Sequence, residues 1–182
     1  MKVTRCEIDG VLLFDLDAYG DDRGLFLETY QKDRYYKAGI KEDFIQDNRS
    51  ISGKDVLRGL HYQISKPIGQ LIYVARGSIF DVGVDLRKSS NTFGQHVSFR
   101  LNADDHRQLY LPPGVAHGFC TFSEINEIHY KCTEYYFPDD EGGVNWQDKD
   151  LSIKWPIKDP HIHERDSSFP HLKDLAESQL PE

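Results

Sequence analysis

Residues 71–85 decide the fold of this chain, and they read LIYVA-RG-SIFDVGVD. Two runs rich in β-branched and aromatic residues flank the pair Arg76-Gly77. Such runs are typical of strands on either side of a tight turn. We therefore predict strands at 71–75 and 78–87 that form a hairpin around Arg76-Gly77.

Similar short stretches recur along most of the chain, separated by glycine or proline turns. A turn cluster at 19–24 leads into one of them, and a single helix candidate covers 31–37 and ends at Gly39. Strands that recur at a spacing of about eight to twelve residues favour an antiparallel sandwich or barrel. We predict an all-β fold, a cupin-like antiparallel jelly-roll barrel with a few short peripheral helices. The remaining predicted strands are 11–14, 25–30, 44–52, the stretch from 56, 95–101, 109–111, 117–122 and 127–136.

The length of the chain, 182 residues, is enough for one domain with a sizeable core and short for two. Neither a repeat nor a low-complexity linker divides it, so we expect a single domain over residues 1–182. Beyond Trp146, prolines at 156, 160 and 170 interrupt the chain too often for strands or long helices. The tail from about residue 147 should therefore wrap around the barrel.

Net charge and cysteine usage limit the class of partner and the compartment. The formal net charge is −8 at pH 7, so the overall field opposes binding to nucleic acids or anionic membranes. Cys6, Cys120 and Cys132 are odd in number and widely spaced, which fits neither a disulfide framework nor a CxxC metal site. No apolar run has the length of a signal-peptide core or a membrane helix. We expect a cytoplasmic protein that binds neither nucleic acid nor membrane.

Two stretches carry polar groups where a core would be apolar. Residues 56–63 read VLRGLHYQ. Arg58 and His61 therefore project from a predicted strand within a few residues of each other. In 44–52 the polar residues are two apart, which places them on one face of a strand. Taken alone, solvent exposure explains that face as well as ligand binding does, and a single histidine at a strand end is more often structural. The alternating residues are Gln46, Asn48, Ser50 and Ser52.

The histidines do not form a metal-binding pattern. A cupin metal site takes an HxH pair with an acid nearby and a further histidine on a later strand. The sole HxH here is His161-Ile162-His163, in the tail, and we expect no metal and no other cofactor. A nucleophile elbow and a glycine-rich phosphate loop are also absent from the sequence. Metal-free acid/base chemistry remains: His61 can take a proton from carbon if a carboxylate fixes its tautomer, and a facing tyrosine can return one, which inverts a stereocentre.

A series of short motifs covers nearly the whole chain, from about Val11 to Asp166. They are GDDRG at 20–24 with Phe26 and Glu28, QDN at 46–48 with Ser50, VLRGLHYQ at 56–63, DV at 81–82 with VDLRKSS at 84–90, TFG at 92–94, AHGF at 116–119, Tyr130-Lys131, Tyr135-Tyr136, Trp146 and Trp155-Pro156. In this combination the chain resembles the dTDP-4-dehydrorhamnose 3,5-epimerases of nucleotide-sugar metabolism.

The resemblance implies a cupin-like homodimer that epimerises a dTDP-linked 4-keto-6-deoxy sugar at C3 and C5 without a cofactor, in rhamnose-type deoxysugar biosynthesis. His61 matches the family's general base, Tyr130 its general acid on the other face of the sugar ring, and Asp166 the acid that orients the base. Positions that match the nucleotide and diphosphate contacts are Arg23, Glu28, Gln46, Asn48 and Arg58. Tyr136 matches the residue that stacks on the base, and His117, Glu141 and Arg165 match further substrate contacts.

One departure from the family pattern concerns Gln70, which stands where the family usually has a lysine. That lysine is expected to help stabilise the developing enolate, whereas a neutral amide donates a hydrogen bond without charge. We count Gln70 among the substrate-binding residues, and it leaves open how many centres are inverted. The alternatives are a C3-only epimerase acting on a related nucleotide-linked 4-keto sugar, a metal-dependent cupin enzyme, and a module that binds a sugar nucleotide without turnover.

Overall fold

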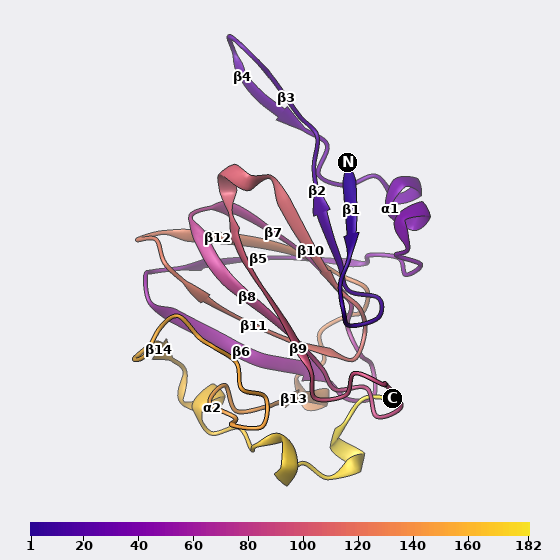
Figure 1. Cartoon of the computed structure of the whole chain (residues 1–182), viewed down its shortest axis with the longest axis vertical. Coiled ribbons are helices and arrows are strands. Elements are labelled where there is room, and N and C mark those ends of the chain that lie inside the picture. Colours follow the sequence, from indigo (N-terminus) through magenta and orange to yellow (C-terminus); the bar gives the residue numbers. More distant parts are fainter.

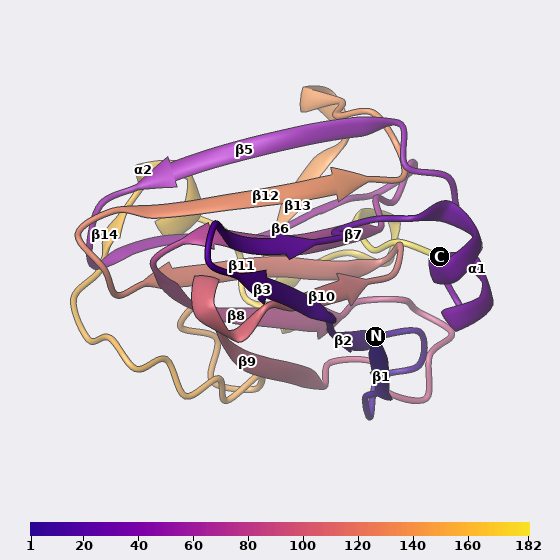
Figure 2. The same ribbon diagram turned by 90° about the horizontal axis from the view of Figure 1, so that it is seen from above.

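The computed structural model describes all residues, 1–182, and consists of two facing β-sheets with a small separate hairpin. The first sheet has the order β1 (Lys2–Arg5), β2 (Leu12–Asp15), β10 (Arg107–Leu111), β7 (Gln70–Arg76), β12 (Asn126–Cys132), β5 (Gln46–Ser52). The second has the order β13 (Glu141–Gly143), β6 (Val56–Gln63), β11 (Val115–Thr121), β8 (Ser78–Asp85), β9 (His96–Asn102), and β14 (His161–Ile162) pairs with β6. The predicted all-β jelly roll is confirmed (Figures 1 and 2).

Helices are short and peripheral, as the sequence predicted. The helix α1 (Lys32–Ala38) begins after Gln31, whose side chain caps the Arg34 amide, and ends at Gly39 with φ +134°. Its buried Tyr35 packs on Phe14 at the side of the barrel. The second helix, α2 (Glu164–Ser167), lies in the tail. Four single-turn 3₁₀ helices cover Ala103–Asp105, Pro138–Asp140, Leu172–Asp174 and Glu177–Gln179.

The apolar core fills part of the space between the two sheets. Inward side chains of the first sheet, such as Ile72 and Ile128, meet those of the second, such as Ile79 and Phe119. On β7 the core residues Ile72 and Val74 are two apart, as are Leu109 and Leu111 on β10, which is the period that puts side chains on one face of a sheet. The rest of the space between the sheets is lined by polar groups and stays open as a cavity.

The connection between β7 and β8 is not the hairpin that the sequence predicted. β7 pairs with β10 and β12 in the first sheet, whereas β8 pairs with β11 and β9 in the second. Gly77 alone separates the two strands, and at φ +83° it turns the chain from one sheet to the other. A Cβ at Gly77 would lie 2.5 Å from the carbonyl oxygen of Ile125. The turn therefore makes a corner of the barrel and requires glycine.

The predicted turn cluster at 19–24 is itself mostly strand. Ala18–Asp21 (β3) pairs with Gly24–Leu27 (β4), and only Asp22 and Arg23 form the turn between them. Figure 1 shows this hairpin projecting away from the barrel. Its apolar side chains are exposed, including Phe26 at 67%.

The tail covers the outer face of the second sheet. Leu151 and Leu180 pack against Leu60, Val82 and other outward side chains of that sheet. In Figure 1 the yellow end of the chain runs below β6. The structure contains no helix with the length and apolar character that crossing a bilayer requires.

Candidate active site

The polar face of β5 points into the barrel. Along Gln46–Ser52 the even-numbered residues are partly or fully buried and the odd-numbered ones are exposed. The apolar Ile51 lies outward, 54% exposed, while polar Asn48 lies inward. The inner face of β5 is thus polar, whereas the inner face of a strand is usually apolar. This polar inner face marks the wall of a polar cavity.

A bulge in β6 brings Arg58 and His61 to the same cavity. Residues three apart in a regular strand lie on opposite faces. Here His61 pairs with His117 and Arg58 with Phe119, so two residues of β6 stand opposite one of β11. Gly59 lies at the bulge, where a Cβ would be 2.5 Å from the Cα of Gly118. The sequence Arg58-Gly59-Leu60-His61 therefore places a cation and an imidazole side by side.

The cavity has a volume of about 420 Å³ and lies between the two sheets. His61 reaches it from β6 in the second sheet, and Tyr130 reaches it from β12 in the first. The two side chains therefore belong to opposite walls. Other predicted site residues that line the cavity are Gln46, Asn48, Arg58, Gln70, His117, Tyr136, Glu141 and Arg165.

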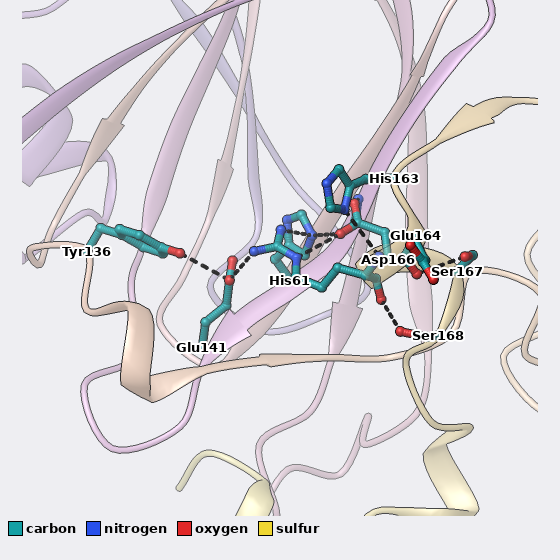
Figure 3. A network of polar contacts seen from close by, with 10 residues as sticks. His61, Tyr136, Glu141, His163, Glu164, Asp166, Ser167 and Ser168 are labelled. Atoms are coloured by element: carbon teal, nitrogen blue, oxygen red, sulfur yellow. Dashed lines mark hydrogen bonds and ion pairs between the residues drawn. The ribbon is translucent and has the colours of Figure 1, made fainter.

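Asp166 lies behind His61 and fixes its tautomer. The Asp166 Oδ1 is 2.9 Å from His61 Nε2, and its Oδ2 accepts the backbone N–H of Gly59 at 3.1 Å (Figure 3). Burial opposes ionisation of Asp166, yet hydrogen bonds from His61, Gly59 and Arg165 lower its pKa to about 2. An ionised carboxylate only accepts, so His61 donates through Nε2 and keeps its lone pair on Nδ1.

Arg165 links this pair to the mouth of the cavity. Its Nε donates to Asp166 at 3.1 Å and its Nη1 donates to Glu141 at 2.5 Å. Glu141 also accepts from the Tyr136 hydroxyl at 3.1 Å, so the contacts in Figure 3 run from Tyr136 to Asp166. The Arg165 Nη2 lies 3.2 Å from His61 Nε2, but a guanidinium only donates, so the hydrogen-bond acceptor for the Nε2–H is Asp166 Oδ1 at 2.9 Å. The guanidinium thus adds positive charge beside the imidazole.

A second histidine–aspartate pair lies next to the first. His117 Nε2 is 3.0 Å from Asp81 Oδ2, and His117 is the cross-strand partner of His61. Asp81 is fully buried. Asp81 belongs to the motif DV at 81–82, for which the sequence predicted no role. The signal was available: an acidic residue inside the apolar run SIFDVGVD needs a buried partner, because an unpaired buried charge is costly.

Tyr130 and Cys132 are neutral members of the opposite wall. Burial raises the pKa of Tyr130, while the nearby charge of Arg58 acts in the other direction. Burial likewise raises the pKa of the Cys132 thiol to about 11. The Cys132 sulfur accepts the side-chain amide of Asn48 at 3.4 Å. Cys132 lines the cavity but was not among the predicted site residues.

Two predicted nucleotide contacts do not reach this cavity. Arg23 is at the tip of the β3–β4 hairpin, where its side chain is 85% exposed and pairs with Asp21. Glu28 follows β4 and pairs with Arg34 at 2.9 Å. Neither residue lines the cavity of its own chain.

No three histidine, cysteine, aspartate or glutamate side chains form a group that could hold a metal ion. The HxH pair of the sequence belongs to β14 and the cap of α2, where the side chain of His163 accepts the backbone N–H of Arg165. That histidine therefore has a structural role in the tail.

The profile of the dTDP-4-dehydrorhamnose 3,5-epimerases matches residues 5–174. The chain belongs to this family. An epimerase of that name from Pseudomonas aeruginosa is 46% identical over 168 residues, which cover 91% of this chain and 93% of the relative. A dTDP-4-dehydrorhamnose 3-epimerase from Streptomyces niveus is 38% identical over 183 residues, covering 99% of this chain and 88% of that protein.

The fold of a family member agrees closely with that of this chain. The 3,5-epimerase of Legionella pneumophila, solved in complex with dTDP-4-keto-L-rhamnose, superposes with a TM-score of 0.95 at 40% identity. The alignment covers 99% of this epimerase and 97% of the Legionella chain. The cupin-like jelly roll predicted from strand spacing is thereby confirmed.

Proposed function

We propose that this epimerase acts on a dTDP-4-keto-6-deoxyhexose and inverts C3 and C5, in dTDP-rhamnose biosynthesis. The observation that carries the proposal is the placement of an aspartate-oriented histidine and a tyrosine on opposite walls of one cavity. Inversion at carbon needs a base on one face of the sugar ring and an acid on the other. The membership of the chain in the 3,5-epimerase family supports the same reaction.

The chemistry starts from the C4 ketone, which acidifies the hydrogens on C3 and C5. The Nδ1 of His61 takes the proton from one of these carbons, the electron pair moves into a C–C double bond, and the C4 oxygen becomes an enolate. Tyr130 then gives its phenolic proton to the same carbon from the opposite face, and the ketone re-forms. Raising the pKa of Tyr130 by burial keeps this phenol protonated before the step. The cycle closes when solvent returns a proton to Tyr130 and removes one from His61.

The polar wall suits the nucleotide half of the substrate. Gln46 and Asn48 present amides from β5, and Arg58 presents a guanidinium from β6. A guanidinium meets phosphate oxygens with two parallel hydrogen bonds. Tyr136, 46% exposed at the mouth, offers a face on which a pyrimidine can stack. Glu141, Arg165 and His117 are proposed to contact the remainder of the substrate.

A C3-only epimerase is the second candidate, and Gln70 together with the Streptomyces niveus 3-epimerase favours it. Incubation with dTDP-4-keto-6-deoxyglucose in deuterated water separates the two. We expect NMR to detect deuterium at both C3 and C5. The sugar ring can present either carbon to His61, so one base can remove both protons. Deuterium at C3 alone would exclude the 3,5-epimerase. If the protein binds the nucleotide but neither carbon gains deuterium, the remaining alternative is a module that binds a sugar nucleotide without turnover.

We propose further that two copies of the chain form a homodimer in which the β3–β4 hairpin of one reaches the site of the other. Three observations support this. Arg23 and Glu28 are distant from the cavity of their own chain. The hairpin exposes Tyr19, Leu25 and Phe26. A groove of about 250 Å³ lies on the outer face of the first sheet, where an apolar segment can pack.

Mixing two defective variants tests the hairpin proposal. We expect Arg23→Ala to raise KM about tenfold or more through loss of a charged phosphate contact, and His61→Asn to be inactive. After subunit exchange between equal amounts, half of the dimers are hybrids. If the hairpin acts in trans, each hybrid has one intact site, made from the His61 of one chain and the Arg23 of the other. A quarter of all sites are then intact, so about a quarter of the parental activity returns at low substrate concentration. No recovery after exchange, or a monomer by analytical ultracentrifugation, would contradict the proposal.

We propose one domain for residues 1–182 and a cytoplasmic location. One pair of packed sheets, with the tail on its outer face, supports the single domain. Three cysteines that are all free support a reducing compartment.

A further inference from the structure

Phe169 in the tail lies against the imidazole of His61. The centroids of the two rings are 5.7 Å apart and their planes meet at 80°, which is an edge-to-face contact. The centroid of the Phe169 ring is also 5.9 Å from the guanidinium carbon of Arg165. Phe169 is not among the residues that line the cavity, so it contacts His61 from behind the cavity wall. The proposed mechanism gives this ring no role.

The space for the Phe169 ring exists because residue 143 is glycine. Gly143 on β13 is the cross-strand partner of His61 on β6. A Cβ at Gly143 would lie 2.3 to 2.4 Å from three carbon atoms of the Phe169 ring. Any larger residue at this position would therefore displace the ring. Gly143 thus allows Phe169 to lie over β13, directly beside the histidine.

Asn145 holds the main chain on both sides of Phe169. Its side-chain amide donates to the carbonyl oxygens of Ser167 at 3.2 Å and of Phe169 at 3.1 Å. Its backbone N–H donates to the carbonyl oxygen of Pro170 at 2.9 Å. Asn145 comes two residues after β13, the strand that pairs with His61. The segment that carries the aromatic ring is therefore fixed to the same part of the sheet as the histidine.

The hydrogen bond to Asp166 fixes only one nitrogen of His61. Asp166 Oδ1 meets the imidazole at Nε2, and the side chain of His61 is 27% exposed. The outer torsion of a histidine side chain has a broad energy minimum, so one hydrogen bond leaves the imidazole free to tilt. Removal of a proton from carbon by Nδ1 requires a fixed direction of approach. The packed ring of Phe169 limits the tilt that Asp166 leaves open.

We propose that Phe169 is a positioning residue, which holds the imidazole of His61 in the orientation that proton abstraction requires. This inference rests on the proposed epimerase function. A displacement of about 1 Å at a reacting group can lower a rate by about 10²-fold. The proposed nucleotide contacts line the cavity, whereas Phe169 does not. Loss of the aromatic ring should therefore lower kcat and leave the binding of dTDP unchanged.

Phe169→Ala tests the role of the ring. We expect kcat for deuterium exchange at C3 and C5 to fall by about tenfold or more, while the affinity for dTDP, measured by calorimetry, stays within about threefold. Phe169→Leu keeps apolar bulk in the tail and should show a smaller loss of the same kind. The matched control is Leu172→Ala, because Leu172 packs on the outer face of the second sheet in the same tail. Parental exchange by Phe169→Ala, or an equal loss in Leu172→Ala, would overturn the proposal.

Gly143→Ala tests the same contact from β13. The added methyl group must displace the Phe169 ring, so we expect this variant to lose about fivefold or more in kcat for exchange. In Phe169→Ala the space is already empty, and adding Gly143→Ala should change kcat by less than about twofold. Losses that multiply in the double variant would overturn the positioning role. Absence of exchange by the parent enzyme would instead refute the epimerase function.

Discussion

His61→Asn is expected to slow exchange of both α protons with solvent by about 10³-fold or more, while the affinity for dTDP changes by less than about threefold. We propose His61 as the base on its wall of the cavity, and Asn cannot take a proton near neutral pH. Asn keeps the approximate size of the side chain and can still contact Asp166, which limits structural change. The affinity should be spared because the proposed nucleotide contacts, the amides of β5 and the Arg58 guanidinium, are unchanged in this variant.

The measurement is NMR detection of deuterium at C3 and C5 over time, with calorimetry for dTDP. A matched control is His161→Asn, since His161 is an exposed histidine on β14, outside the cavity lining. The control should exchange at the parental rate. Exchange by His61→Asn at the rate of the control would show that another group is the base.

The sequence predicted the strands well because their period of two depends on local residue types. The polar face of 44–52 is the best example, since the same alternation both identified β5 and indicated that its inner side was unusual. The partners of the strands were harder to predict. Gly77 is compatible with a hairpin and with a barrel corner, and only the packing against Ile125 distinguishes them.

Local residue patterns predicted only part of the site. His61, Tyr130 and Asp166 come from three distant segments, and the resemblance brought them together where local pattern could not. The bulge at Gly59, which turns Arg58 toward His61, depends on contact with Gly118 and has no signature in residue types alone. The location of Arg23 outside the cavity could not be predicted either, because residue types alone do not show that the β3–β4 hairpin projects away from the barrel.

Tyr130→Phe is expected to separate proton exchange from inversion. Inverted product should fall by about 10²-fold or more, whereas exchange at C3 and C5 should fall by less than about tenfold. The side chain of His61 is 27% exposed, so the proton that it removes can be replaced by deuterium from solvent. His61 then returns deuterium to the face from which the proton came, which labels the carbon without inverting it.

The Tyr130 hydroxyl is the group that this substitution removes, while the ring and its packing remain. The enolate forms as before but lacks an acid on the wall of β12. NMR of the product gives both quantities from one sample, since label and configuration are read at the same carbons. Tyr135→Phe is the matched control, because Tyr135 is 55% exposed and lies outside the cavity lining. Loss of exchange and inversion in equal proportion would place Tyr130 in enolate stabilisation, and full inversion by Tyr130→Phe would place the acid elsewhere.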